Sequence, residues 1–209
     1  MRAVERRREM GSKKVDDVIF TTESNAPMLA ICYAKGWAAH SDYMLRSEAE
    51  AVTSIGTAFK NQNSIVTLDL SAFTKLTTLS VDFMLNDTNV TKAIFPYTIK
   101  SVISYAVQLN NNYQGITCIF GDDSNGSQLT WMQNYHPIRA VGKLVIYSET
   151  PPYWSSNVSG SQGTPGSSSI NGSCQIYVPD DAVDTWKNSG SNMWGNYAAR
   201  IHPISDFQE

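Results

Sequence analysis

Short apolar alternations recur along most of this chain at a nearly constant interval. Their centres lie 26, 24, 28 and 30 residues apart, at Leu68, Ile94, Cys118, Ile146 and Ile176. Such an interval is typical of a solenoid, in which every turn adds one strand to a parallel sheet. A βαβ protein can show similar intervals, but its crossovers need helices of about ten or more residues. The connections here are rich in Asn, Thr and Ser instead, which favours a parallel β-sheet with irregular turns.

A weaker second series of apolar positions lies between these centres. It comprises Ile55, Leu79 and Val102, each in a short segment with Ser or Thr beside it. These positions predict a second set of short strands that closes the interior from the side opposite the main sheet. The predicted fold class is therefore an α/β solenoid.

The chain before and after the periodic region differs from it in composition. Residues 26–35 predict a helix with Pro27 in its first turn and Gly36 as its stop, and residues 47–51 predict another with Ser47 as N-cap. Near the other end, Trp194, Tyr197 and Ile201 have the spacing of one helical face. We expect a basic arm (1–14), a helical lead-in (15–51), a solenoid (52–178) with a Ser/Gly-rich loop (155–173), and a C-terminal cap (179–209).

Two segments carry a resemblance to a known family. The segment VTSIGTAFKNQNSIVTLDL (52–70) contains Ile55-Gly56-x-x-Phe59 followed by Ile65-x-x-Leu68-x-Leu70. It resembles the BspA-type leucine-rich repeat of gut Bacteroides-like bacteria and their phages. The segments LVIYSETPPYW (144–154) and 174–204, which begins CQIYVPDD, are similar to that family's closing repeat and terminal cap. The resemblance covers roughly residues 52–204 and implies a leucine-rich-repeat solenoid.

The first fourteen residues are electrostatically distinct from the rest. Six basic residues stand there against Glu5 and Glu9, so the arm carries +4 and the remainder of this −3 chain carries −7. The RRREMG run is similar to the starts of phage-encoded family members, and no secretory signal follows it. The resemblance thus implies a virion protein, anchored to other virion proteins by Arg2, Arg6, Arg7 and Arg8. Nucleic acid is a poorer partner because the acidic body would repel it.

No pattern in the sequence indicates catalysis, a cofactor or a bound metal. The histidines His40, His136 and His202 lie far apart, and no phosphate-binding or nucleophile motif is present. The run from Asp122 to Gly126 has the composition of a turn after a strand. If Glu48 closed an EF-hand-type loop, Trp37 would stand where the first carboxylate is needed, so calcium is not expected.

Three cysteines, Cys32, Cys118 and Cys174, form no CxxC pair. The predicted strand order separates Cys118 and Cys174 by roughly 10 Å, beyond the reach of a disulfide. We expect reduced thiols in the core.

Aromatic residues beside predicted turns are the candidate ligand contacts: Trp37, Trp131, Tyr135, Tyr153 and Trp154. Such rings can stack on sugars or on protein side chains, although we favour the alternative that they close the ends of the solenoid interior. We expect a non-enzymatic structural or attachment module of a phage virion, homo-oligomeric and not membrane-bound. The alternatives are a bacterial surface adhesin for a host protein or glycan, with its export signal outside this sequence, and a glycosidase.

Overall fold

The computed structural model describes residues 17–87, 89–108, 116–133, 137–139, 141–154, 173–189 and 194–209. The chain divides into two compact units, residues 1–49 and residues 50–209. The predicted anchor arm 1–14, the candidate contact Tyr135 and most of the predicted loop 155–173 lie outside the described residues.

The first unit contains a two-stranded antiparallel sheet and a helix. Strand β1 (Val18–Thr21) pairs with β2 (Tyr43–Leu45), a pairing that the sequence did not predict. Helix α1 (Thr22–Ala34) is kinked at Asn25, and the part after the kink covers residues 26–34 of the predicted helix. The additional first turn begins at Thr21, which forms a capping box with Ser24. It ends before Gly36, whose φ of +70° suits glycine, as predicted.

A short helix, α2 (Arg46–Ala51), follows β2 and reaches into the second unit. Ser47, the predicted N-cap, lies inside this helix, so that prediction is wrong. Glu48 is the residue of this helix whose side chain binds the neighbouring backbone. Its carboxylate accepts the backbone N–H groups of Ala39 and Leu45 at 2.8 and 2.7 Å, so both oxygens are engaged in holding the β2 connection.

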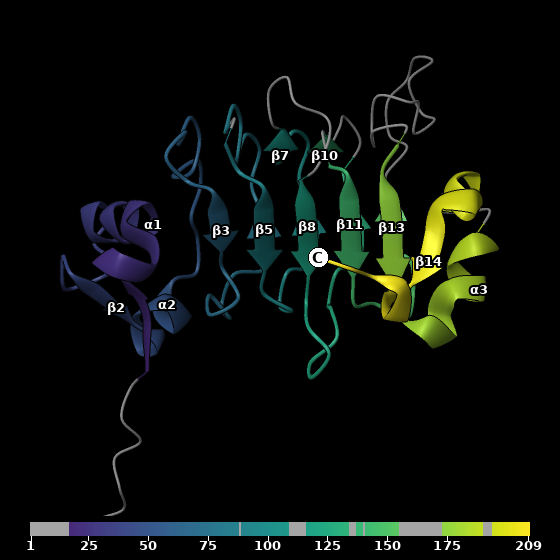
Figure 1. The fold of residues 1–209 in the computed structure, drawn as a ribbon, viewed down its shortest axis with the longest axis horizontal. Helices are drawn as coiled ribbons and strands as arrows, with labels where there is room; N and C mark the ends of the chain where they lie inside the picture. Colours follow the sequence, from purple (N-terminus) through teal and green to yellow (C-terminus); the bar gives the residue numbers. More distant parts are fainter. Residues whose placement is uncertain are drawn as a thin grey trace, which may run out of the picture. The chain divides into compact units, whose positions relative to one another are not determined.

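The second unit is built on a six-stranded parallel sheet (Figure 1). Its strands are β3 (Thr67–Asp69), β5 (Lys92–Phe95), β8 (Thr117–Phe120), β11 (Lys143–Ile146), β13 (Gln175–Val178) and β14 (Ile201–Pro203). They pair in the order of the chain, and all their pairings are parallel. The register joins Leu68, Ala93 and Cys118. The predicted centre Ile94 is therefore wrong by one residue, because Phe95 faces the core and Ile94 faces outward.

The connections between strands of the large sheet contribute a second parallel sheet of four short strands. It contains β4 (Thr78–Leu79), β6 (Ser101–Val102), β9 (Trp131–Met132) and β12 (Tyr153–Trp154). Strand β7 (Val107–Gln108) pairs separately with β10 (Ile138–Arg139). The predicted second series is found at Leu79 and Val102, whereas Ile55 belongs to no strand. Parallel β-sheets with few helices thus make up the described fold.

A column of phenylalanine rings fills part of the interior. Neighbouring ring centroids lie 5.5, 6.1 and 4.7 Å apart along Phe59, Phe83, Phe95 and Phe120. Each ring is essentially inaccessible to solvent. The three cysteines are buried free thiols, as expected, and burial raises the pKa of Cys32 and of Cys174 to about 12.

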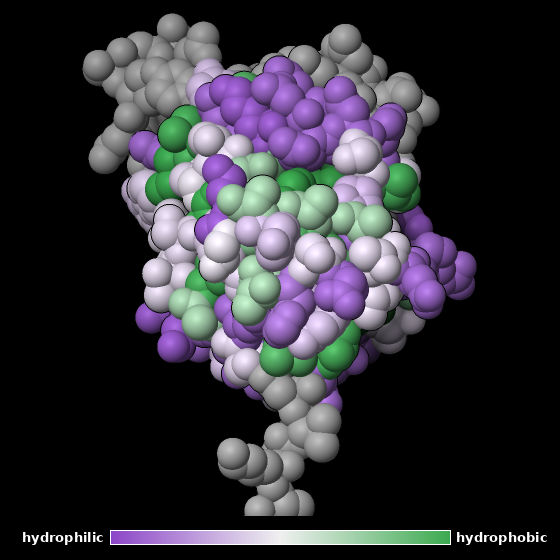
Figure 2. All heavy atoms as spheres, turned by 90° about the vertical axis from the view of Figure 1, so that its left-hand side faces the viewer, coloured by the Kyte–Doolittle hydropathy of each residue, from purple (hydrophilic) through white to green (hydrophobic). Residues whose placement is uncertain are grey.

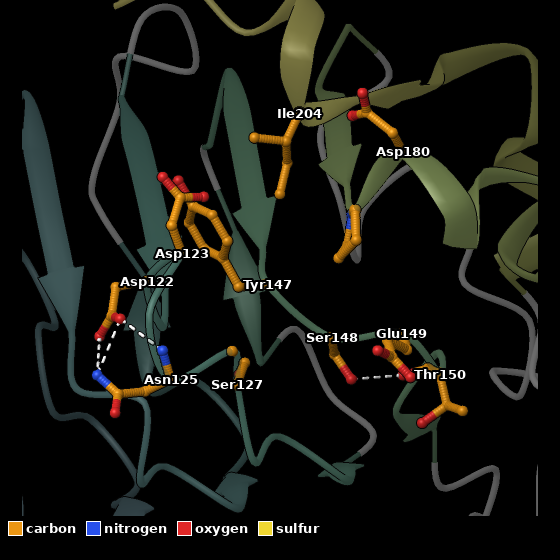
Figure 3. A pocket seen from close by; sticks show the side chains of 12 residues that line it. Asp122, Asp123, Asn125, Ser127, Tyr147, Ser148, Glu149, Thr150, Asp180 and Ile204 are labelled. Carbon is orange, nitrogen blue, oxygen red and sulfur yellow. Dashed lines mark hydrogen bonds between the residues drawn. The ribbon is translucent and has the colours of Figure 1, made fainter.

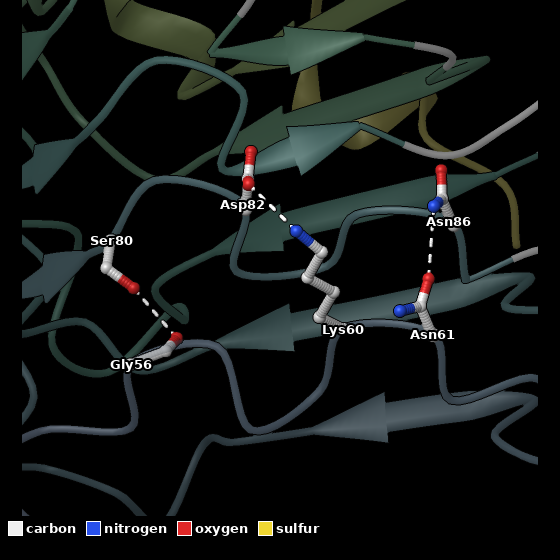
Figure 4. A network of polar contacts seen from close by, with 6 residues as sticks. All are labelled: Gly56, Lys60, Asn61, Ser80, Asp82 and Asn86. Atoms are coloured by element: carbon white, nitrogen blue, oxygen red, sulfur yellow. Dashed lines mark hydrogen bonds and ion pairs between the residues drawn. The ribbon is translucent and has the colours of Figure 1, made fainter.

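The loops that precede β3 and β5 are joined by polar side chains (Figure 4). Lys60 pairs with Asp82 at 3.0 Å, and the amide of Asn86 donates to Asn61 at 3.0 Å. The Ser80 hydroxyl donates to the Gly56 carbonyl at 2.7 Å. Figure 2 shows a cluster of hydrophilic side chains at the top of that view. We call residues 57–65 and 82–87 the polar loops.

The chain after β13 packs as a cap around two indole rings. It runs through η2 (Asp180–Ala182), α3 (Val183–Lys187) and η4 (Trp194–Arg200). Trp186 and Trp194 are fully buried, with centroids 4.8 Å apart. The predicted single helical face is wrong in one respect, because Ile201 lies in β14 and pairs with Ile176. The cap thereby adds a sixth strand to the sheet.

Candidate functional site

A cleft of about 700 Å³ opens where the strands of the large sheet end (Figure 3). Its lining comes from the segments that follow β8, β11, β13 and β14, so the carboxyl ends of four neighbouring strands build it. We call it the acidic cleft. Its lining includes four carboxylates and no lysine or arginine: Asp122, Asp123, Glu149 and Asp180.

The segment after β8 is a tight turn that Asp122 organises. Its carboxylate accepts the backbone N–H groups of Ser124 and Asn125 at 2.9 and 2.8 Å, and the Asn125 side-chain amide at 2.9 Å. At Gly121, whose φ is +87°, any side chain would collide with the Gly126 carbonyl. The interpretation of Asp122–Gly126 as a turn is confirmed, and this turn presents Asp123 to solvent at the rim of the cleft.

The opposite wall of the cleft begins at Asp180, directly after β13. Its carboxylate accepts the backbone N–H of Ser205 at 3.1 Å. Hydrogen bonds from Ser205 lower the pKa of Asp180, so this group carries a charge at neutral pH. The contact also fixes the segment that follows β14, from which Ile204 reaches the cleft.

The middle of the cleft is formed by the segment after β11. Burial raises the pKa of the Tyr147 hydroxyl, and the negative charges of Asp123 and Asp122 raise it further. Tyr147 therefore remains a neutral phenol that can donate a hydrogen bond. Ser148 is buried, and its hydroxyl donates to the Thr150 carbonyl at 2.8 Å, which holds the wall that carries Glu149.

The chemistry of this lining suits a cationic or hydrogen-bond-donating group. Several acidic side chains without a neighbouring base would attract an ammonium or guanidinium group. Within the described ranges, no three His, Cys, Asp or Glu side chains are grouped so that they could hold a metal ion. In the same part of the chain, no helix has the length and apolar character needed to cross a membrane.

The structure separates the aromatic residues that the sequence singled out. Trp37 is half-buried in the first unit. Trp131 and Tyr153 are in register on β9 and β12, and Tyr153 is 50% exposed. Trp154 is only 3% exposed and packs on Trp194 at 5.3 Å, so it cannot reach a ligand unless the cap moves.

Sequence reasoning missed the acidic cleft because it weighed the run from Asp122 to Gly126 by itself. Glu149 and Asp180 lie 27 and 58 residues further along the chain. A usable signal was present, since each of these carboxylates follows a predicted strand within three residues. Parallel strands bring such positions to one edge of a sheet.

Comparison with known proteins leaves the chain without a family assignment. No known protein family matches the sequence, and no characterised protein matches it significantly.

Proposed function

We propose that the second unit is a leucine-rich-repeat solenoid of the BspA type. The observation that carries this is the nearly constant interval between paired residues of the large sheet. Thr67, Lys92, Thr117 and Lys143 are in register on successive strands, 25, 25 and 26 residues apart. Strands that alternate between two parallel sheets support the same proposal, because each turn would then supply one strand to each sheet.

Deleting one whole turn tests this architecture. Lys92 pairs with Thr117, so removing residues 92–116 places Thr117 where Lys92 stood. A solenoid tolerates such a deletion because every turn contacts only its neighbours. We expect a shorter protein with a cooperative thermal transition. A matched deletion of residues 92–103, about half a turn, should not fold, and equal behaviour of the two deletions would refute the solenoid.

We further propose that the protein is a non-enzymatic attachment module of a phage virion, as a fibre or a head or tail decoration. In this role the basic arm docks on acidic surfaces of other virion proteins, and the sheets display binding residues such as Trp131 and Tyr153. A self-association of copies is part of the proposal. The acidic cleft supports a binding role, since Asp122 is engaged in its own turn and Asp180 has a lowered pKa, which suits neither as a proton donor.

Fractionation of the native source tests the proposed location. A virion protein should sediment with DNA-containing particles, whereas an adhesin should follow the cell envelope. Replacing Arg2, Arg6, Arg7 and Arg8 by glutamine should reduce particle association. The matched control replaces Lys35, Lys75 and Lys100, three exposed lysines of the body, by glutamine. Equal losses in both variants would refute the anchor, and hydrolysis of a host polysaccharide would refute the non-enzymatic role.

A further inference from the structure

The outer face of the six-stranded sheet carries a row of apolar side chains. Ile94, Ile119, Val145 and Tyr177 are in register on four neighbouring strands. Alternate residues of a strand point to opposite sides, and the residues between them point into the core. All four side chains therefore point away from the core. A continuous apolar row on an outward face is typical of a surface that contacts other polypeptide.

The last residues of the chain cross this row. We call residues 204–209 the strap. Figure 1 shows the chain end running from β14 across β13 and β11. The Phe207 ring lies 5.1 Å from the Tyr177 ring, and the Lys143 ammonium lies 5.6 Å from the centre of the Phe207 ring. Because Tyr177 and Lys143 flank Val145, the Phe207 ring covers the apolar row there.

The burial of residues along the strands agrees with a strap that covers part of the outer face. In β5 and β13, residues alternate between buried and half-exposed. In β8 and β11 the third residue is buried as well, although it points outward. Val145 is fully buried and Ile119 is 8% exposed. The strap thus supplies to these two strands a layer that the rest of the sheet lacks.

Two lysines of a second outward row hold the end of the strap. Lys143 donates to the carbonyl of Gln208, and Lys92 pairs with the Glu209 carboxylate at 2.6 Å. In register, Thr117 lies between these two lysines. The outer face therefore offers an apolar surface that a ring can contact and, two residues further along the bound segment, a cation for a carboxylate.

These contacts lie at the surface and are separate from the interior of the cap. The Glu209 side chain is 68% exposed, and exposed ion pairs contribute little to stability. The cap is fixed independently by Trp186 and Trp194, whose indole N–H groups donate to main-chain carbonyls. The strap can therefore leave the sheet from Asp206 onward, while Ser205 stays bonded to Asp180 and the core stays packed.

We propose that this outer face, across β5, β8, β11 and β13, binds an extended segment of a partner protein with an aromatic residue two positions before a carboxylate. The strap is the built-in competitor for this surface, with Phe207 and Glu209 in the two recognised positions. A partner segment must displace it to bind. This inference does not depend on the repeat family or on the assembly proposed above.

Peptide binding to the full chain tests the proposal. The probe is a fluorescently labelled peptide with the sequence of residues 203–209, followed by anisotropy. The double variant Phe207→Ser/Glu209→Gln should bind it about tenfold more tightly than the wild type, or better, because a tethered competitor acts at an effective concentration in the millimolar range. In that background, Lys143→Glu should abolish binding. Lys100→Glu, a matched exposed lysine, should leave binding unchanged, and a peptide with alanine in place of phenylalanine should not bind.

The proposal is overturned if the double variant melts like the wild type yet binds the peptide no better, or if Lys143→Glu leaves that binding intact. Should the double variant not fold, Glu209→Lys in the otherwise intact chain replaces it. That change removes the ion pair and sets a like charge beside Lys92, which loosens only the strap. It should still raise peptide affinity, and the absence of any gain would overturn the proposal equally.

Discussion

The cap and the polar loops hold neighbouring chain segments together by opposite means. In the cap, Trp186 and Trp194 are fully buried, and their indole N–H groups donate to the carbonyls of Ser148 and Pro152 at 3.0 and 2.8 Å. In the polar loops, half-exposed side chains reach from one loop to the next, as Lys60 does to Asp82. Water can replace a contact of the second kind but not one of the first.

This difference indicates where the stability of the second unit resides. A buried hydrogen bond inside an aromatic cluster combines apolar burial with the cost of leaving a polar group unpaired. A half-exposed polar contact sets loop geometry at little net free energy. Asp87 is the exception among the loops, because it is 1% exposed and its Oδ2 has no hydrogen-bond partner among the described residues.

The largest effect is expected at the centre of the cap. Trp194→Ala should lower the free energy of unfolding by about 3–5 kcal/mol, because it leaves a cavity beside Trp186 and removes the bond to Pro152. Trp194→Phe keeps most of the packing and should cost about 1–3 kcal/mol. Chemical denaturation followed by far-ultraviolet circular dichroism measures both free energies of unfolding, because this signal does not depend on tryptophan fluorescence. A loss below about 1 kcal/mol for the alanine variant would break the contrast with the loops.

Asp87 should give the protein a stability that depends on pH. Burial raises the pKa of Asp87 to about 6 from its ordinary 3.8, while the N–H of Gln62 lowers it only partly. The folded state therefore holds a proton that the unfolded state releases, so this stabilisation is full below pH 3.8 and is lost as pH rises through 6. The loss amounts to about 2–3 kcal/mol at pH 7.

The variant Asp87→Asn isolates this contribution, since it keeps an acceptor for Gln62 and cannot ionise. Unfolding free energies measured between pH 4 and pH 7 should be flatter for the variant than for the wild type. Asp82→Asn, at a half-exposed carboxylate of the same loop, is the matched control. Equal pH dependence in wild type and Asp87→Asn would show that Asp87 is ionised in the folded protein without penalty.

A smaller loss of stability is expected at Asn61, which tests the contribution of the polar loops. Its φ of +61° lies in the left-handed region, and its side-chain oxygen accepts the Asn86 amide. Asn61→Ala should cost about 1–2 kcal/mol, since alanine is strained there and the bond is lost. Asn61→Gly relieves the strain and should cost less than the alanine variant. Thermal melts compare the two, and equal losses in the two variants would assign the effect to the hydrogen bond and not to backbone strain.

The sequence predicted the parallel strands well, because alternation within a strand is a local signal and the nearly constant interval repeats along the chain. It placed Ile94 inward wrongly, since Lys92–Phe95 holds apolar residues at three successive positions and only packing decides which face they take. Phe95 stacks on Phe120 at 4.7 Å, and this contact turns Ile94 outward. A register slip of one residue cannot be resolved by composition.

Other features depend on contacts between distant segments, which the sequence does not display. Strands β9 and β12 have two residues each, and their places in the second sheet depend on pairing with neighbouring strands. The acidic cleft combines segments that follow four different strands. The strap was assigned to the cap, but its contact with Lys92 spans 117 residues of sequence. What could be predicted is the spacing of strands, and what could not is which side chains meet at their ends.

The smallest effect is expected at the ion pair between Lys60 and Asp82, whose side chains are 33% and 31% exposed. A double-mutant cycle with Lys60→Met and Asp82→Asn tests this pair. Methionine replaces the apolar part of the lysine side chain, and asparagine tolerates the φ of +57° at position 82. The coupling should be about 0.5 kcal/mol and should fall toward zero in about 1 M salt. A coupling above about 2 kcal/mol that persists in salt would mean that these loops exclude water as the cap does. The contrast between the two regions would then rest on Trp186 and Trp194 alone.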